Sequence, residues 1–417
     1  MPRITFFLFF TATLSFFVLS SDVLSLFGYN FLLEGGYSLY KLHPSFYILF
    51  FSVLSLFLYR GGPLLLSTLL IRYNFHFLFL LLFLCFFYQV FLLKQPMATT
   101  LITWFTPLLI LMMFFSLTSE QQVYINKILL NLITFNAFIG LFEYVIGSGI
   151  VPKNYYDLEQ GAFVDVSEWG FERSSSLYGH PLIASFVSAV VVVGLFSKNL
   201  HFKLSISEKV CLSLSLLSLP AFGGRFSILI SIFVLLVLFF IWFYYFISGA
   251  EVFRVKIILG MVFIAMFPFL ILFLFNLGLF DLLILRVTDD NGSAESRLTA
   301  LYILFDTPLK ELLFGDLNSD LYFRQLLYGT KYGVELSWVA SILQSGLLVT
   351  LIFIFVLYCV VKVLYIYIGP HTFFSSFAFL LISFSGTGLS SKTLMLSQFV
   401  LISIFILNVK NESFVRA

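Results

Sequence analysis

Charged residues are scarce in this chain of 417 residues. Asp, Glu, Lys and Arg together make up 11% of it, whereas apolar residues make up 60%, and the mean hydropathy is +1.05. A soluble globular domain has about 25% charged residues, so this composition excludes that class. We expect an all-α polytopic membrane protein, with 1–417 forming a single integral membrane domain.

Cysteine is also rare, and the common motifs of cofactor chemistry are missing. Cys85, Cys211 and Cys359 each fall inside an apolar run, which excludes a disulfide framework and a CxxC metal site. The sequence has no HExxH motif, no glycine-rich phosphate loop and no recognisable Ser-His-Asp set. We therefore expect no cofactor and no metal. The net charge of +2 gives no reason to expect a nucleic-acid partner.

Long apolar runs dominate what is present. About 20 helical residues cross the roughly 30 Å of hydrocarbon in a bilayer, and by this measure we predict twelve spans. The stretch from Pro63 to Ile71 is predicted to lie at the interface. The spans lie near 4–20, 45–59, 75–93, 97–117, 127–147, 180–197, 209–222, 226–247, 256–278, 336–361, 372–388 and 392–409.

Lys and Arg are concentrated in alternate short loops, among them Arg3, Arg60 and Lys198. Such loops favour the cytoplasmic side, and an even number of spans then places both termini there. Two long loops, 148–179 and 278–335, fall on the outer side. We expect the chemistry to take place in or just above the outer half of the membrane.

The predicted span interiors are nearly free of ionisable groups. Glu143, near the outer end of the fifth span, is the main exception. Ion-coupled carriers usually place carboxylates near the middle of the membrane. This pattern therefore favours an enzyme over a carrier, although a flippase or permease without chemistry stays an alternative.

Five arginines gather instead at the predicted outer rim. The guanidinium group binds phosphate through two parallel charge-assisted hydrogen bonds and stays charged. The set predicts a site for a lipid-linked pyrophosphate. The alternative for each residue is a solvated arginine, or one whose side chain reaches lipid phosphates. The five are Arg173, Arg225, Arg286, Arg297 and Arg324.

Arg225 lies in the segment 219–227, where a proline and two glycines interrupt apolar sequence on both sides. A charged side chain at bilayer depth costs about 2.5–3.5 kcal/mol even on the mildest scale. We therefore expect Arg225 at the mouth of an anion-binding cavity. A helix-end arginine that snorkels to the surface is the competing interpretation.

Two further residues are candidates for acid–base chemistry. His180 precedes Pro181 at the start of a span, where it could donate to a phosphate or act as a base, or simply begin the helix. Glu335 lies where the second long loop enters the membrane. Partial desolvation there would suit a general base, and a carboxylate is also favoured at a helix N-terminus.

Four segments between about 125 and 360 carry a family resemblance. They are Arg173 with Ser176-Leu177-Tyr178-Gly179-His180-Pro181, then Phe222-Gly223-Gly224-Arg225-Phe226-Ser227, then Ser296-Arg297 with Thr307-Pro308 and Leu313-Phe314-Gly315, and Val334-Glu335-Leu336-Ser337-Trp338 to Gln344-Ser345-Gly346-Leu347-Leu348. In this order they resemble the O-antigen ligase and polymerase superfamily, although the glycine-to-histidine spacing is shorter here.

The resemblance implies a glycosyltransferase of the bacterial inner membrane that uses undecaprenyl-pyrophosphate-linked glycans at the periplasmic face. Ligases of this family carry a His-Asn type motif where this chain has Glu335-Leu336-Ser337-Trp338. The departure favours a Wzy-type polymerase of O-antigen, capsule or exopolysaccharide repeat units. A ligase that moves glycan to a lipid A core or a protein is the alternative. Whether a chain-length regulator binds is left open.

The outer arginines and the order of the motifs suggest roles for the candidate residues. Arg225 and Arg297 would hold the pyrophosphate, and Arg173 would orient the donor or the acceptor. The resemblance leaves the base unassigned, and Glu335 is our candidate for it. The remaining substrate-binding candidates are His180, Arg286 and Arg324.

Overall fold

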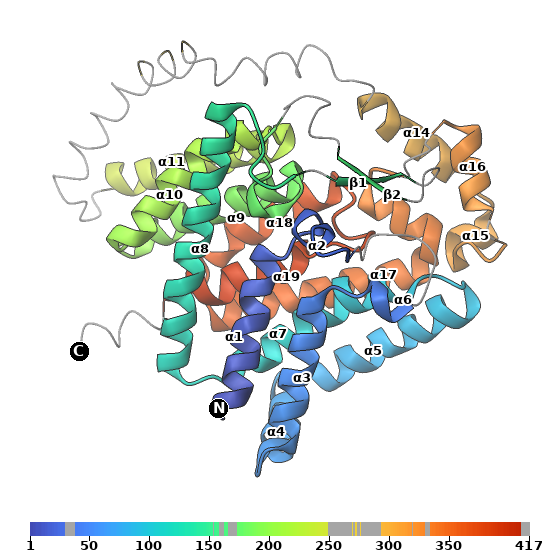
Figure 1. Cartoon of the computed structure of the whole chain (residues 1–417), viewed down its shortest axis with the longest axis horizontal. Helices are drawn as coiled ribbons and strands as arrows, with labels where there is room; N and C mark the ends of the chain where they lie inside the picture. Colours follow the sequence, from blue (N-terminus) through green and yellow to red (C-terminus); the bar gives the residue numbers. More distant parts are fainter. Residues whose placement is uncertain are drawn as a thin grey trace.

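The computed structural model describes residues 1–29, 38–152, 154–157, 162–165, 173–248, 269, 272, 276, 293–318, 320–329 and 334–409. These residues are mostly helical (Figure 1). The first part of the chain forms α1 (Arg3–Val18), α2 (Ser21–Ser25), η1 (Ser38–Lys41), α3 (Pro44–Leu58), α4 (Gly62–Arg72), α5 (Phe75–Phe87), η2 (Tyr88–Leu92), α6 (Met97–Thr100), η3 (Leu101–Phe105), α7 (Thr106–Phe115) and α8 (Ser119–Ile146).

The second part continues the helical pattern after one short hairpin. Its strands β1 (Asn154–Asp157) and β2 (Ala162–Asp165) pair antiparallel, with Asn154 opposite Asp165. The helices are η5 (Ser176–Tyr178), α9 (Pro181–His201), α10 (Ile206–Phe222), α11 (Arg225–Ile247), α14 (Ser293–Phe305), α15 (Leu309–Phe314), α16 (Leu321–Leu327), α17 (Ser337–Tyr367), α18 (Thr372–Phe384), α19 (Met395–Leu401) and η6 (Ile402–Ile406).

Among the described residues, six helices are long and apolar enough to cross a membrane, or seven if the bent pair α3–α4 is one span. The chain is therefore a helical membrane protein. The shorter apolar helices fall at three more of the predicted spans, so twelve spans stay a prediction. The predicted span 256–278 lies almost wholly outside the described residues. The six are Phe75–Leu92, Met97–Phe115, Ser119–Ile146, Pro181–His201, Arg225–Tyr244 and Ser337–Tyr367.

Helix α9 is at the centre of the described helices. It packs against α10, α11, α18 and α19, and Val190 to Val193 are completely buried. Gly194 lets Leu407 approach so closely that a Cβ there would lie 2.7 Å from a Leu407 methyl carbon. Small and β-branched side chains allow this approach of helices in a membrane. By contrast, α5 and α11 are mostly exposed, as lipid-facing helices are expected to be.

Helix α17 is not continuous. Gly346 inside it has φ 82° and ψ 160°, and Gly315, after α15, has φ 83°. Their backbones cross so closely that a Cβ on either glycine would lie 2.6–2.9 Å from backbone atoms of the other segment. The Asp316 N–H donates to the Gln344 carbonyl at 3.2 Å. This crossing attaches α15 to α17 and so fixes the unit α14–α16 to the transmembrane helices.

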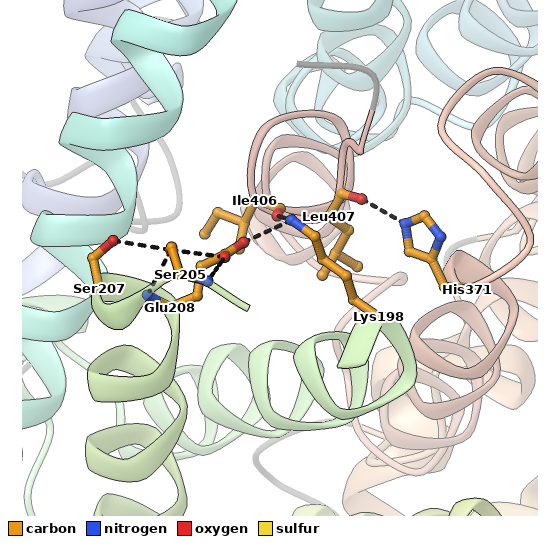
Figure 2. A network of polar contacts seen from close by, with 7 residues as sticks. All are labelled: Lys198, Ser205, Ser207, Glu208, His371, Ile406 and Leu407. Carbon is orange, nitrogen blue, oxygen red and sulfur yellow. Dashed lines mark hydrogen bonds and ion pairs between the residues drawn. The ribbon is translucent and has the colours of Figure 1, made fainter. Parts of the chain in front are cut away.

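A polar network joins the C-terminal end of α9 to α10 and to the C-terminal helices (Figure 2). Lys198 Nζ lies 2.6 Å from Glu208 Oε1 and donates to the Ile406 carbonyl at 3.3 Å. His371 Nε2 is 2.5 Å from the Leu407 carbonyl oxygen. The prediction that Lys198 lies in a short loop after the span is wrong, since the residue lies in the last turn of α9 and is fully buried. Its charge is stabilised by an ion pair, which counting loop lysines cannot reveal.

Candidate functional site

The loop that carries Arg173 is bonded to the turn that carries Arg225. The Ser174 N–H donates to the Ala221 carbonyl at 3.2 Å, and Ala221 lies in the last turn of α10. Two of the predicted arginines therefore belong to neighbouring segments, although 51 positions separate them in the sequence. We call the segments 173–180 and 219–227 together the arginine end of the helices.

Glu143 holds the first of these segments in place. Its side chain is 1% exposed. Oε2 accepts the N–H groups of Ser175 at 3.1 Å and Ser176 at 2.9 Å, and Oε1 accepts that of Ile150 at 3.0 Å. A buried carboxylate bonded by several N–H groups makes strong, charge-assisted hydrogen bonds. The acidic residue near the end of the fifth predicted span therefore anchors this loop.

His180 caps helix α9. Its backbone is extended, and Nδ1 accepts the Leu182 N–H at 3.2 Å. This bond leaves the proton of a neutral ring on Nε2. Gly179, with φ 73°, lies so close to Ser20 after α1 that a Cβ would come within 2.7 Å of it. The geometry gives His180 the role of a helix-start residue, which was one of the two roles considered from the sequence.

The turn between α10 and α11 is formed by its two glycines. Pro220 stays inside α10, and the helix ends at Gly223, which has φ 63° in the left-handed region. A Cβ on Gly224 would lie 2.2 Å from Ser185 Oγ, so glycine lets this turn pack directly on α9. The prediction of a helix break in this segment is confirmed, but the glycines cause it and the proline does not.

Arg225 is the first residue of α11. The N-terminus of a helix has unpaired N–H groups and a partial positive charge, so a cation there is unfavourable and an anion favourable. An anion bound at this turn would interact with the guanidinium and with the helix terminus together. Ser174 and Ser185 also lie at this turn, and their buried hydroxyl groups have no hydrogen-bond partner among the described residues. The turn therefore has several unused donors for an anion.

Arg297 and Glu335 form an ion pair between α14 and the residues before α17. Arg297 Nε lies 3.7 Å from Glu335 Oε2, and both side chains are a little over 40% exposed. An ion pair this exposed contributes at most about 1 kcal/mol to stability. The candidate base and one candidate pyrophosphate ligand are thus brought together. Because the pair is weak, it can open for a substrate at little cost.

Arg324 has a different environment. Its guanidinium pairs with Glu311 and donates to Thr307 Oγ1 at 3.2 Å, and the pair is largely buried. This arrangement joins α16 to α15 and to the segment between α14 and α15, so Arg324 has a structural partner where a substrate phosphate was expected. Arg286 lies outside the described residues.

Helix α18 connects the arginine end with the Arg297–Glu335 pair. It packs against α9 and α11 and also against α17. The Ser337 N–H donates to the Gly386 carbonyl at 2.8 Å, and its hydroxyl donates to the Ser383 carbonyl at 2.6 Å. The start of α17, two residues after Glu335, is thereby fixed to the end of α18.

Metal binding has no support within the described segments, where no three His, Cys, Asp or Glu side chains lie close enough together to hold an ion. The arrangement is suited to binding an anion through arginines, hydroxyl groups and a helix N-terminus. The sequence pattern did not indicate the unpartnered hydroxyls of Ser174 and Ser185, because serine is common in the surrounding helices.

No family model, no curated protein and no solved structure matches this chain.

Proposed function

We propose that this protein is a membrane glycosyltransferase that polymerises glycan repeat units carried on undecaprenyl pyrophosphate. The observation that supports this best is the arginine end, where the Arg173 segment is bonded to the turn that carries Arg225 at a helix N-terminus. A lipid-linked pyrophosphate is an anion that remains at the membrane surface while its lipid tail lies along apolar helices. The arginine end offers that anion charge, hydrogen-bond donors and adjacent exposed apolar surface on α11.

In the proposed reaction, a hydroxyl oxygen of the acceptor repeat attacks the anomeric carbon of the growing chain. A new glycosidic C–O bond forms, and the bond from that carbon to the lipid pyrophosphate breaks. Glu335 takes the hydroxyl proton, and Arg225 stabilises the charge that develops on the leaving pyrophosphate. Arg173 orients one of the two glycans. Much of the rate comes from holding the two lipid-anchored substrates in line.

Arg297 has two tasks in this scheme. In the absence of substrate it pairs with Glu335. When the pyrophosphate arrives, the guanidinium turns toward it, which frees the carboxylate to accept a proton. The proposed site lies at the periplasmic face of a bacterial inner membrane, where such glycans are assembled.

The test uses purified protein with lipid-pyrophosphate-linked repeat units matched to its source, and the products are separated on a gel. We expect a ladder of repeats on one lipid, and we expect Arg225→Ala and Arg297→Ala each to reduce its yield at least tenfold. Lys310→Ala, which removes an exposed positive charge from α15, is the matched control and should leave the ladder unchanged. A full ladder from both arginine variants would refute the proposal. Transfer of the glycan to an added lipid A core without a ladder would identify a ligase.

A further inference from the structure

An open groove of about 790 Å³ runs between α1 and α3. It lies at the end of α1 away from the arginine end, because the segment after α1 contacts Gly179 whereas the groove begins at the start of that helix. Figure 1 shows α1 and α3 side by side near the N-terminus. Its lining includes Arg3, Thr5, Ile48, Leu54, Ser55 and Tyr59.

Hydrogen bonds between the two helices hold the groove in shape. Thr5 Oγ1 lies 2.9 Å from Ser55 Oγ, and the Ser52 hydroxyl donates to the Thr5 carbonyl at 3.0 Å. These short side chains hold the helix backbones close together, while the longer apolar side chains form the walls. Beyond Tyr59 the chain turns, and α4 departs at 113° to α3. The groove is thus a fixed feature of this helix pair.

The length of the groove matches one leaflet of a membrane. The eleven residue steps from Ile48 to Tyr59 rise about 16 Å at about 1.5 Å per residue. Half of the roughly 30 Å hydrocarbon core is about 15 Å. An acyl chain that starts at the membrane surface and reaches the middle of the bilayer would therefore fill it.

Charge is confined to one end of the groove. Arg3 is the one charged residue among those that line it, and Tyr59 lies at the same end. Arg60, which follows, is exposed. Arginine and tyrosine are the side chains that meet lipid headgroups at an interface, and arginine pairs with phosphate. The groove is apolar along its length and basic at its mouth. These features complement the apolar acyl chains and the anionic phosphate of a phospholipid.

We propose that this groove binds an anionic glycerophospholipid of the leaflet on the Arg3 side, with its phosphate on Arg3 and one acyl chain between α1 and α3. A second copy of the chain is a poorer occupant, since a symmetric dimer through this surface would bring the two Arg3 side chains together. The inference does not depend on the proposed function, because the groove is at the other end of α1.

The test measures bound lipid by native mass spectrometry of the full chain in detergent, with phosphatidylglycerol, phosphatidylcholine or undecaprenyl phosphate added. We expect retention of phosphatidylglycerol over phosphatidylcholine. Arg3→Gln should reduce that preference about fivefold, as expected for one basic group near an anionic headgroup. Leu54→Trp should fill the groove and reduce retention of every lipid. The controls on α4 are Arg72→Gln and Leu64→Trp, both at exposed positions outside the groove.

Arg3 is exposed, so the glutamine variant is expected to fold, and a thermal unfolding curve checks this for both groove variants. Equal lipid retention by Arg3→Gln and Arg72→Gln would overturn the proposal. So would displacement of phosphatidylglycerol by an equal amount of undecaprenyl phosphate, or a mass of two protein copies that Leu54→Trp abolishes.

Discussion

Glu143 shows how a single side chain can determine the shape of a loop next to a membrane. Its carboxylate accepts three backbone N–H groups from two segments, Ile150 and Ser175–Ser176. Glutamine keeps the size of the side chain but removes its charge. Its NH₂ group cannot accept a hydrogen bond, so at least one backbone N–H would lose its acceptor. We expect Glu143→Gln to destabilise the protein by about 3 kcal/mol, measured by thermal unfolding in detergent.

The matched control is Glu120→Gln in the exposed first turn of α8, which should change stability by no more than about 0.5 kcal/mol. If Glu143→Gln and Glu120→Gln had the same melting temperature, the carboxylate of Glu143 would not anchor the loop. Because the same loop carries Arg173, the glycan ladder should also weaken in Glu143→Gln.

His43 predicts a dependence of stability on pH. It is buried at the N-cap of α3, where Nδ1 accepts the Ser45 N–H at 3.2 Å and Nε2 lies 2.5 Å from the Leu19 carbonyl oxygen. Burial lowers its pKa from 6.5 to about 4, and the hydrogen bond to Leu19 offsets part of that effect. A lowered pKa in the folded state means that stability is present above about pH 6.5 and is lost as the pH falls toward 4. The loss is about 1.4 kcal/mol per pH unit for one such group.

The measurement is the melting temperature in detergent between pH 7.5 and about pH 4. Asparagine can cap the helix without titrating, so His43→Asn should flatten the curve relative to the unmodified protein. His76→Gln, at an exposed position, should leave the curve unchanged. If His43→Asn kept the full pH dependence, other groups would be responsible for it.

At the scale of elements, the crossing of Gly315 and Gly346 joins the α14–α16 unit to α17. Alanine at Gly315 would place its Cβ 2.7 Å from the Gln344 carbonyl oxygen and would also require a positive φ. Gly329 provides a matched control, since it has φ 74° but nothing within 4 Å of a Cβ. We expect Gly329→Ala to cost about 1 kcal/mol through its backbone alone and Gly315→Ala clearly more.

Limited proteolysis reports this difference at the element itself. We expect cleavage in α14–α16 to become faster in Gly315→Ala and to stay near its original rate in Gly329→Ala. Equal rates in the two variants would mean that the close backbone contact does not hold the unit in place. A faster ladder reaction in Gly315→Ala would be unexpected, because Arg297, which pairs with Glu335, lies in the unit that this crossing positions.

Apolar runs in the sequence predict where helices lie, but they do not predict which distant residues form contacts in the fold. Each predicted span follows from a local apolar run, because crossing a membrane imposes a length on consecutive residues. The Arg297–Glu335 pair, the anchoring role of Glu143 and the burial of Lys198 all depend on segments far apart in the sequence. The Arg225 turn was recognisable because its glycines and its arginine are consecutive. By contrast, no local pattern shows that Arg324 pairs with Glu311.

At the scale of the whole molecule, one end of α9 contacts the proposed site and the other end stabilises the packing of the helices. One end contacts the arginine end through the Gly224 turn, and the other carries Lys198, which links α10 and η6 through Glu208 and the Ile406 carbonyl. The rise of α9 from Pro181 to Lys198 is about 25 Å. Stability and the proposed chemistry should therefore respond to different substitutions.

The buried Lys198–Glu208 pair provides the last prediction. Replacing either partner leaves the other charge buried and unpaired, so Lys198→Met and Glu208→Gln should each destabilise the protein by about 3–5 kcal/mol. The double variant removes both charges and should be more stable than the sum of the single changes implies, by at least about 1 kcal/mol in a double-mutant cycle. Thermal unfolding measures all four proteins. At temperatures where they stay folded, the double variant should still make the full glycan ladder, whereas Arg225→Ala should lose it. Simple additivity in the cycle would show that the two charges do not stabilise each other.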